Sequence, residues 1–110
     1  MDKTSILQMM LPKVKPLSLG DETIFLSQWL LVEADNIIKA QKEFSEDAIT
    51  ANEFFAVVAI NSACDESGKR IFEVSDMDAL SQSSAVTLKA IYREAMEMNS
   101  VKMEEDAEKN

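Results

Sequence analysis

The sequence AVVAINSACDESGKRIFEVSDMD, residues 56–78, contains the transition that decides how the chain folds. An apolar run breaks at CDESG, and a basic pair, an Ile-Phe pair and a second acidic cluster follow. Glycine adopts turn conformations easily because it lacks Cβ, so Gly68 predicts a turn after a helix. We expect an extended segment next, which buries Ile71 and Phe72 before another helix begins.

The second acidic cluster is interpreted as the start of a short helix, MDAL, residues 77–80. Ser75 or Asp76 is expected to cap this helix, because short polar side chains accept hydrogen bonds from the free amides of a first turn. Acidic residues at this end also interact favourably with the helix dipole.

The acidic residues of this stretch do not match a calcium loop. An EF-hand loop that begins at Asp65 requires glycine at its sixth position, whereas Gly68 comes two places earlier. The chain has one cysteine and no histidine, which excludes the usual zinc-site spacings and a cysteine–histidine nucleophile. Cys64 is interpreted as a buried structural residue. We therefore predict no metal, no cofactor and no catalytic residue, and the chain is predicted not to be an enzyme.

The segment TANEFFAVVAINSA, residues 50–63, is predicted to be a helix. Its β-branched and aromatic residues would also suit a buried strand. Thr50 and Glu53 decide between the two, because their spacing is that of a capping box, in which each side chain accepts from the backbone amide of the other residue. The helix is apolar nearly all round, which predicts a central position among the other helices.

A β-hairpin is predicted between residues 14 and 29. The runs VKPLSL, residues 14–19, and ETIFLSQW, residues 22–29, have strand-forming composition. Gly20 and Asp21 lie between them and form a pair that suits a tight hairpin turn. Pro16 is expected on an edge strand, because proline has no amide hydrogen to donate to a neighbour.

Helices are predicted on both sides of this hairpin. SILQMML, residues 5–11, predicts a brief helix that Thr4 caps and Pro12 ends. Residues 28–43 predict a long amphipathic helix, with charged residues such as Glu33 on the side opposite its apolar stripe. That stripe comprises Leu30, Ala34, Ile37, Ile38, Gln41 and Phe44.

The last predicted helix follows Ser83 or Ser84 as its cap, and Asn99 is expected to end it in left-handed geometry. Residues 101–110 lack a core-forming pattern and predict a flexible acidic tail. The fold class is mainly α, with one small domain at residues 1–100 that has about four helices and a short N-terminal β-hairpin. The apolar stripe of the last helix comprises Leu88, Ile91, Tyr92, Ala95 and Met98.

Composition restricts the classes of partner. The formal net charge is −9, whereas nucleic-acid binding depends on Lys and Arg that neutralise phosphates. No apolar run approaches the roughly 18 to 20 residues that span a bilayer, and the apolar stretch near the N-terminus is too short for a signal peptide. We expect a cytoplasmic protein without a nucleic-acid or membrane partner.

The C-terminal half, roughly residues 54–101, resembles the tail assembly chaperones of long-tailed bacteriophages and prophages. In that family an apolar helix leads into an Asp-Glu-x-Gly turn and a hydrophobic-Phe pair. An Asp-x-x-x-Leu helix follows, and a final helix ends in a Leu-Asn pattern, where this chain has Met98 in place of leucine. The hairpin and helix of the N-terminal half fit the family in outline. The matching residues are Asp65, Glu66, Gly68, Phe72, Asp76, Leu80, Leu88 and Asn99.

The resemblance implies a non-enzymatic role in the cytoplasm of a bacterial host. Such chaperones coat the long helical tape measure protein and keep it soluble until tail tube subunits polymerise around it. They are absent from the finished virion. Several members also exist as a longer product of ribosomal frameshifting, whose extension recruits tail tube subunits. Self-association of the chain is expected as well.

Apolar residues near the ends of the chain are the candidate partner-binding residues. The sequence has seven methionines, whose flexible side chains can pack against varied helical partners. The N-terminal segment and the exposed edge of the last helix are expected to contact the client or neighbouring copies. An alternative function is that of a small acidic phage-encoded adaptor or inhibitor that binds one folded host protein. The candidate contact residues are Ile6, Leu7, Met9, Met10 and Met96.

Overall fold

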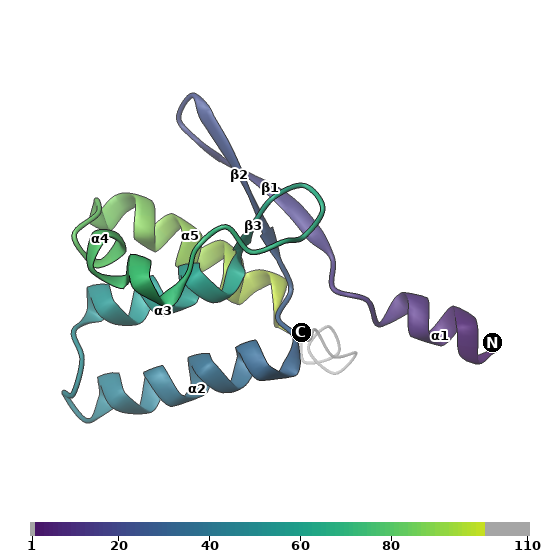
Figure 1. Cartoon of the computed structure of the whole chain (residues 1–110), viewed down its shortest axis with the longest axis horizontal. Helices are drawn as coiled ribbons and strands as arrows, with labels where there is room; N and C mark the ends of the chain where they lie inside the picture. The colour runs from purple at the N-terminus through teal and green to yellow at the C-terminus, as the bar shows by residue number, and fades with distance from the viewer. Residues whose placement is uncertain (1, 101–110) are drawn as a thin grey trace, which may run out of the picture.

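A mainly helical fold with an N-terminal β-hairpin, as predicted, is present in a computed structural model that describes residues 2–100 (Figure 1). The predicted tail, residues 101–110, lies outside the described residues. The helices are α1 (Lys3–Met9), α2 (Leu31–Ser45), α3 (Ala51–Ser62), α4 (Met77–Ser81) and α5 (Ala85–Met98), with a 3-10 turn, η1 (Val74–Asp76). The strands β1 (Val14–Leu19), β2 (Glu22–Ser27) and β3 (Ala63–Cys64) form an antiparallel sheet in the order β1-β2-β3.

The capping box predicted at Thr50 starts α3, the central helix. Thr50 Oγ1 accepts a hydrogen bond from the Glu53 amide at 3.1 Å, and Glu53 Oε1 accepts one from the Thr50 amide at 2.8 Å. The helix packs against α2, α4 and α5 and buries Phe54, Val58 and Ala59. The prediction of a central helix, in preference to a strand, is therefore confirmed.

The C-terminal end of α3 differs from the prediction. The helix stops at Ser62, and Ala63 and Cys64 are extended as strand β3, which the sequence pattern does not indicate. In the sheet, Ala63 lies opposite Leu26 and Cys64 lies opposite Phe25. The buried backbone of these two residues pairs with β2 on one side, and on the other side the Ala63 carbonyl accepts a hydrogen bond from the Ile71 amide at 3.4 Å. A further helical turn is therefore not needed to satisfy their polar groups.

The predicted hairpin is confirmed, with Val14 opposite Ser27 and Leu19 opposite Glu22. Gly20 in the turn has φ of 65°, a left-handed conformation that glycine adopts without steric cost. Pro16 lies in β1, which is an edge strand, as expected. Figure 1 shows the hairpin projecting beyond the helices, with its tip free of them.

The start of α2 was predicted too early, at residue 28. The helix begins at Leu31, because the backbone amides of the two residues after β2 donate hydrogen bonds to more distant parts of the chain. The Gln28 amide donates to the Lys13 carbonyl at 2.9 Å, and the Trp29 amide donates to Asn99 Oδ1 at 2.8 Å. These bonds hold the chain extended until it has left the sheet.

Part of the predicted apolar stripe of α2 does not reach the core. Ile37 is buried, and so is Ala40, which the predicted stripe omitted. Ile38 and Phe44 are exposed, although the Phe44 ring stacks on that of Phe54 with 5.6 Å between centroids. The helix packs along α3, and contact with one neighbour buries a narrower face than the sequence pattern suggests.

The turn at Gly68 is confirmed by its φ of 91°. The prediction that Ile71 and Phe72 are both buried is wrong for Ile71, which is 46% exposed. Phe72 is half-buried and packs against the core. Successive side chains of an extended segment point to opposite sides, so the burial of Phe72 leaves Ile71 in solvent.

The position of the cap predicted for the short helix α4 is confirmed, because Asp76 is its N-cap residue, but the predicted side-chain hydrogen bond is not made. Asp76 precedes this helix, but neither its side chain nor that of Ser75 caps it. Asp76 Oδ2 instead accepts a hydrogen bond from the Glu73 amide at 2.7 Å. A 3-10 turn, η1, therefore precedes α4, and Asp76 closes that turn.

The apolar stripe of α5 is confirmed, since Leu88, Ile91 and Ala95 are buried. The helix follows Ser84, whose side chain makes no capping hydrogen bond. The left-handed ending predicted at Asn99 is wrong, because this residue has φ of −101°. Its side chain bonds the Ala95 carbonyl and the Trp29 amide, so the helix ends without a positive φ.

Candidate partner-binding surface

The α1 arm, residues 2–11, carries five exposed large apolar side chains. None of the residues Lys3–Met9 is buried, and Figure 1 shows α1 standing away from the other helices. The exposed fractions are 40% for Ile6, 55% for Leu7, 63% for Met9 and 71% for Met10. Four of the five predicted contact residues are therefore accessible on one element.

The cap of α1 is Asp2, and the prediction of Thr4 is wrong. Asp2 Oδ1 accepts a hydrogen bond from the Ser5 amide at 2.8 Å. This bond favours the carboxylate and lowers the pKa of Asp2. The arm therefore has a defined helical start, although it packs few of its side chains.

A short strap, residues 11–13, joins the arm to the sheet. The Lys13 amide donates to Gln28 Oε1 at 2.9 Å, and the Lys13 carbonyl accepts from the Gln28 amide at the same distance. Two bonds to one residue fix the place where the arm leaves the domain. Three surface hollows surround this place, and Gln28 lines all of them.

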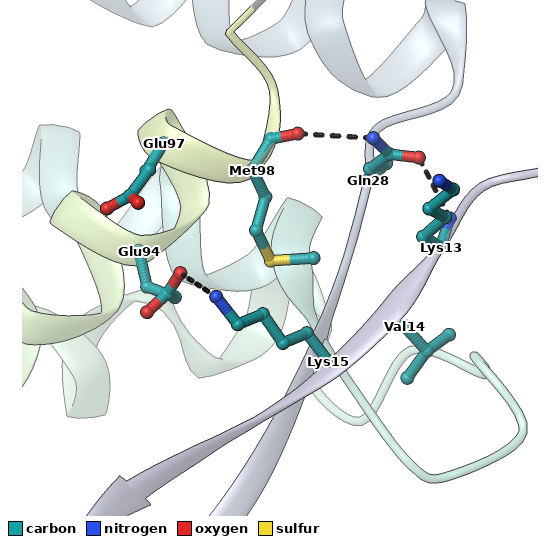
Figure 2. Close-up of a pocket in the computed structure, with 7 residues that line it drawn as sticks. All are labelled: Lys13, Val14, Lys15, Gln28, Glu94, Glu97 and Met98. Atoms are coloured by element: carbon teal, nitrogen blue, oxygen red, sulfur yellow. Dashed lines mark hydrogen bonds and ion pairs between the residues drawn. The ribbon is translucent and has the colours of Figure 1, made fainter.

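The first of the three hollows lies between β1 and the end of α5 and is called the sheet hollow. It has a volume of about 390 Å³ (Figure 2). Lys15 Nζ pairs with Glu94 Oε2 across it at 3.1 Å, an exposed ion pair that contributes little to stability. Gln28 Nε2 donates to the Met98 carbonyl at 3.2 Å. The lining residues are Lys13, Val14, Lys15, Gln28, Glu94, Glu97 and Met98.

The second, called the turn hollow, contains a bidentate ion pair between α2 and the Gly68 turn. Arg70 Nε donates to Glu33 Oε2 and Arg70 Nη2 donates to Glu33 Oε1, both at 2.7 Å. Arg70 Nη1 also donates to the Ser62 carbonyl at 2.8 Å. This parallel geometry is the strong form of an Arg–carboxylate contact, and it fastens the turn to the first turn of α2.

Glu33 also completes the start of α2, because its Oε1 accepts from the Leu30 amide at 2.8 Å. Burial acts to raise the pKa of Glu33, but the hydrogen bonds from Arg70 and Leu30 outweigh it and hold the pKa below its ordinary value. Glu33 therefore remains ionised, and its role is to hold two elements together.

The third, called the α2 hollow, lies between the start of α2 and the end of α5 and has a volume of about 340 Å³. Leu31 on its rim is 80% exposed, and Leu30 is exposed as well. None of its lining residues carries a charge. They are Met10, Pro12, Gln28, Trp29, Leu30, Leu31, Met98, Asn99 and Ser100.

Asn99 connects the two sides of the α2 hollow. Its Nδ2 donates to the Ala95 carbonyl at 2.7 Å, and its Oδ1 accepts from the Trp29 amide at 2.8 Å. The Trp29 indole donates to the buried Ser62 Oγ at 2.7 Å. The resemblance selected Asn99 by position, and its structural task is to tie α5 to the segment between β2 and α2.

Asp65 organises the turn after β3. Its Oδ1 accepts from the Ser67 hydroxyl at 2.6 Å, from the Ser67 amide at 2.8 Å and from the Lys69 amide at 3.0 Å. The bonds from Ser67 and Lys69 lower the pKa of Asp65. A Cβ atom at Gly68 would lie 3.4 Å from Val14 Cγ2, so the turn approaches β1 closely.

The other residues selected by the resemblance have three different structural surroundings. Leu80 and Leu88 are buried, and Phe72 packs against the core. Asp76 closes η1. Glu66 is exposed and makes no side-chain hydrogen bond within residues 2–100. These positions shape the fold around the hollows without forming one cluster.

Sequence reasoning missed the residues that build the surface, namely Gln28, Glu33 and Arg70. Glu33 was expected on the solvent side of its helix, and a partner 37 residues later in the chain is not visible in a local pattern. The only local signal was the three-residue spacing from Leu30 to Glu33, which lacks the serine or threonine of a typical capping box. Met96 is half-buried on α5 and does not line the three hollows.

Cys64 is a buried free thiol on strand β3. Burial raises the pKa of the Cys64 thiol, which disfavours the nucleophilic thiolate. Within residues 2–100, no group of three or more His, Cys, Asp or Glu side chains could hold a metal ion. No helix in this range is long and apolar enough to cross a membrane.

Comparison with known proteins identifies a similar fold. No protein-family model matches the chain, and no curated protein matches its sequence. Among solved structures, the bacteriophage HK97 tail assembly chaperone is similar, with a TM-score of 0.64. The alignment covers 94% of this chain and 100% of that chain, at 12% sequence identity. The likeness concerns the fold over nearly the whole length of both chains.

Proposed function

We propose that the chain is a tail assembly chaperone, a non-enzymatic protein that binds the helical tape measure protein of a long-tailed phage. It keeps this client soluble until tail tube subunits polymerise around it. The observation that carries the proposal is the shared fold with the HK97 tail assembly chaperone over 94% of this chain. The matching residues of the sequence, among them Asp65 and Asn99, support the same family.

The exposed apolar side chains support a binding function. The α1 arm and the rim of the α2 hollow present leucine, isoleucine and methionine to solvent on separate elements. Exposed apolar patches of this kind on small proteins mark sites of interaction. An amphipathic helix of the client could pack against such side chains at its own three- and four-residue spacing.

The net charge of the chain suits a protein that covers its client and keeps it soluble. A net charge of −9 on 110 residues keeps coated clients apart through mutual repulsion. Under this proposal the chain acts in the host cytoplasm, associates with further copies of itself on the client, and is absent from the mature virion. A longer frameshifted product would carry an extension that recruits the tail tube protein.

The first test is co-expression with the tape measure protein of the same phage or prophage. We expect the client to stay in the soluble fraction and to copurify with many copies of the chain. The double variant Met9→Ser/Met10→Ser should leave most of the client insoluble. Val74→Ser, which changes a 79% exposed residue elsewhere, is the matched control. A client that remains insoluble with the wild-type chain would contradict the proposal.

A second test concerns the longer product. The gene is expressed from its native DNA with several hundred nucleotides of downstream sequence, and the lysate is probed with an antibody to this domain. A second, longer band that continues into the next reading frame would support recruitment of the tail tube protein. A single band would contradict the extension and leave client binding to the first test.

A further inference from the structure

The side of α2 opposite α3 is exposed in the described part of the chain. The helix packs along α3, and Figure 1 shows it at the edge of the molecule with α3 on one side only. Leu31 is 80% exposed and Ile38 is 64% exposed. These two residues are seven positions apart, so they lie on one side of the helix. We call this side the outer face. It consists of Leu31, Asp35, Ile38, Lys39 and Lys42, all of which are exposed.

Apolar and charged residues follow a distinct order along the outer face. From the start of the helix, an apolar, an acidic and an apolar residue precede two basic ones. Asp35, Lys39 and Lys42 make no ion pair within residues 2–100. The lysine pair therefore attracts an acidic segment, whereas Asp35 attracts a basic residue.

The chain leaves α5 beside the start of the outer face. Ser100 and Leu31 both line the α2 hollow, and α2 leads away from this hollow. The rise from Leu31 to Lys42 is about 17 Å at 1.5 Å per residue. Six extended residues after Ser100 span about 20 Å. Residues 101–106 are therefore long enough to follow α2 as far as Lys42.

The same six residues have an order complementary to that of the outer face. An apolar, a basic and an apolar residue precede three acidic ones. If both segments run in the same direction, apolar residues lie opposite apolar residues and each charge lies opposite its counter-charge. Single exposed ion pairs are weak, but several pairs in sequence favour one register and one direction. The six residues are Val101, Lys102, Met103, Glu104, Glu105 and Asp106.

The sheet hollow, which also adjoins the end of α5, fits this segment less well. Lys13 and Lys15 line it, but Glu94 and Glu97 line it too. Lys15 is already paired with Glu94. An acidic segment in the sheet hollow would therefore face two carboxylates as well as two lysines.

We propose that residues 101–106 pack along the outer face of α2 in the same chain and cover Leu31 and Ile38. A segment joined directly to Ser100 has a millimolar effective concentration at this face, which favours it over the segment of another copy. A client helix that packs against Leu31 must displace the segment, so the segment competes with the client. This consequence rests on the proposed function, whereas the contact itself does not.

The first test is carbodiimide coupling of the full-length chain without a client. This reagent joins a lysine amine directly to a carboxylate that it contacts, and mass spectrometry of the digest identifies the joined residues. We expect Lys39 or Lys42 to couple to the carboxylates of residues 104–106. Lys89, an exposed lysine on α5, is the matched control and should not couple to them. A mixture of ordinary and isotope-labelled chains distinguishes coupling within one chain from coupling between two.

The second test measures how well the outer face is covered. Ile38→Cys places a thiol on this face, and the native Cys64 is buried. Glu104→Lys/Glu105→Lys in the same chain sets lysines against the lysine pair of α2. The rate at which a thiol reagent labels position 38 should then rise about threefold or more, since the exposed ion pairs that close the contact are individually weak.

The matched control for this charge reversal is Glu22→Lys/Glu66→Lys. Both glutamates are exposed, and their replacement changes the net charge by the same amount. Labelling at position 38 should be unchanged in this control. An equal rise in both variants would show that net charge governs the labelling rate and would overturn the inference.

Three further outcomes would overturn the inference. They are no coupling of Lys39 or Lys42 to residues 104–106, coupling only between two chains, and a labelling rate that the reversal at Glu104 and Glu105 leaves unchanged. Client binding is measured separately, and the same reversal should increase it. A wild-type chain that fails to bind the client contradicts the proposed function and leaves the contact along α2 standing.

Discussion

The helices α3 and α1 are both rich in apolar residues, but their surroundings are opposite. α3 packs against three other helices and places six of its residues in the interior, whereas α1 buries none. Apolar composition therefore does not determine burial in this chain. The position of each helix in the topology decides whether its apolar side chains stabilise the fold or remain available to a partner.

The largest effect is expected from a truncation beside α3. Leu88 on α5 is 1% exposed, so Leu88→Ala should lower the free energy of unfolding by about 2–5 kcal/mol. Urea denaturation measures this change. Val86→Ala, on the same helix but exposed, should change stability by no more than about 0.5 kcal/mol. Similar losses in both variants would break the contrast between interior and surface.

A smaller loss is expected where the turn is fastened to α2. Arg70→Met leaves the half-buried Glu33 carboxylate without its bidentate partner and should cost about 1–3 kcal/mol in urea denaturation. Lys69→Met removes a neighbouring exposed charge that makes no ion pair within the described residues. An equal loss in the two variants would mean that the bidentate ion pair between Arg70 and Glu33 does not connect the Gly68 turn to α2.

The same carboxylate makes stability depend on pH. Because the pKa of Glu33 is lower in the folded chain, its stabilising effect is fully present above the ordinary value of 4.5 and is lost as pH falls through the folded pKa. Asp65 acts in the same direction. Unfolding free energies measured at decreasing pH should fall less steeply in Glu33→Gln than in the wild type. Glu66→Gln is the control, and an unchanged slope in Glu33→Gln would contradict the assignment.

The smallest effect on stability is expected from the arm. Ile6→Ser/Met9→Ser should change the free energy of unfolding by no more than about 0.5 kcal/mol at concentrations where the chain is monomeric. Denaturation at low protein concentration, with circular dichroism as the signal, checks this value. A loss comparable to that of Leu88→Ala would show that α1 belongs to the folded core.

Local patterns predicted the elements whose signals are contained in a few adjacent residues. The capping box at Thr50, the turn at Gly20 and the stripe of α5 all belong to this group. The short strand β3 could not be predicted, because Ala63 and Cys64 become extended only through pairing with β2. The same limit applies to α2. The start of this helix depends on the hydrogen bonds that the backbone amides of Gln28 and Trp29 donate to Lys13 and Asn99.

The candidate surface was predictable in one part. The apolar residues of the arm were selected because they lie near an end of the chain, and the structure leaves them exposed. The hollows were not, since Gln28, Met98 and Leu31 meet only after β2 and α5 have packed together. The residues selected through the family resemblance turned out to support the fold, with Asn99 and Gly68 adjoining the surface.

The single tryptophan of the chain lies where its fluorescence can follow both the filling of the α2 hollow and the unfolding of the chain. Trp29 lines the α2 hollow, its amide is bonded to Asn99, and its indole is bonded to the buried Ser62. Its fluorescence therefore reports on the hollow without an added label. Filling of the hollow by an apolar helix would exclude water from the ring and shift its emission to shorter wavelength, whereas unfolding would shift the emission in the other direction.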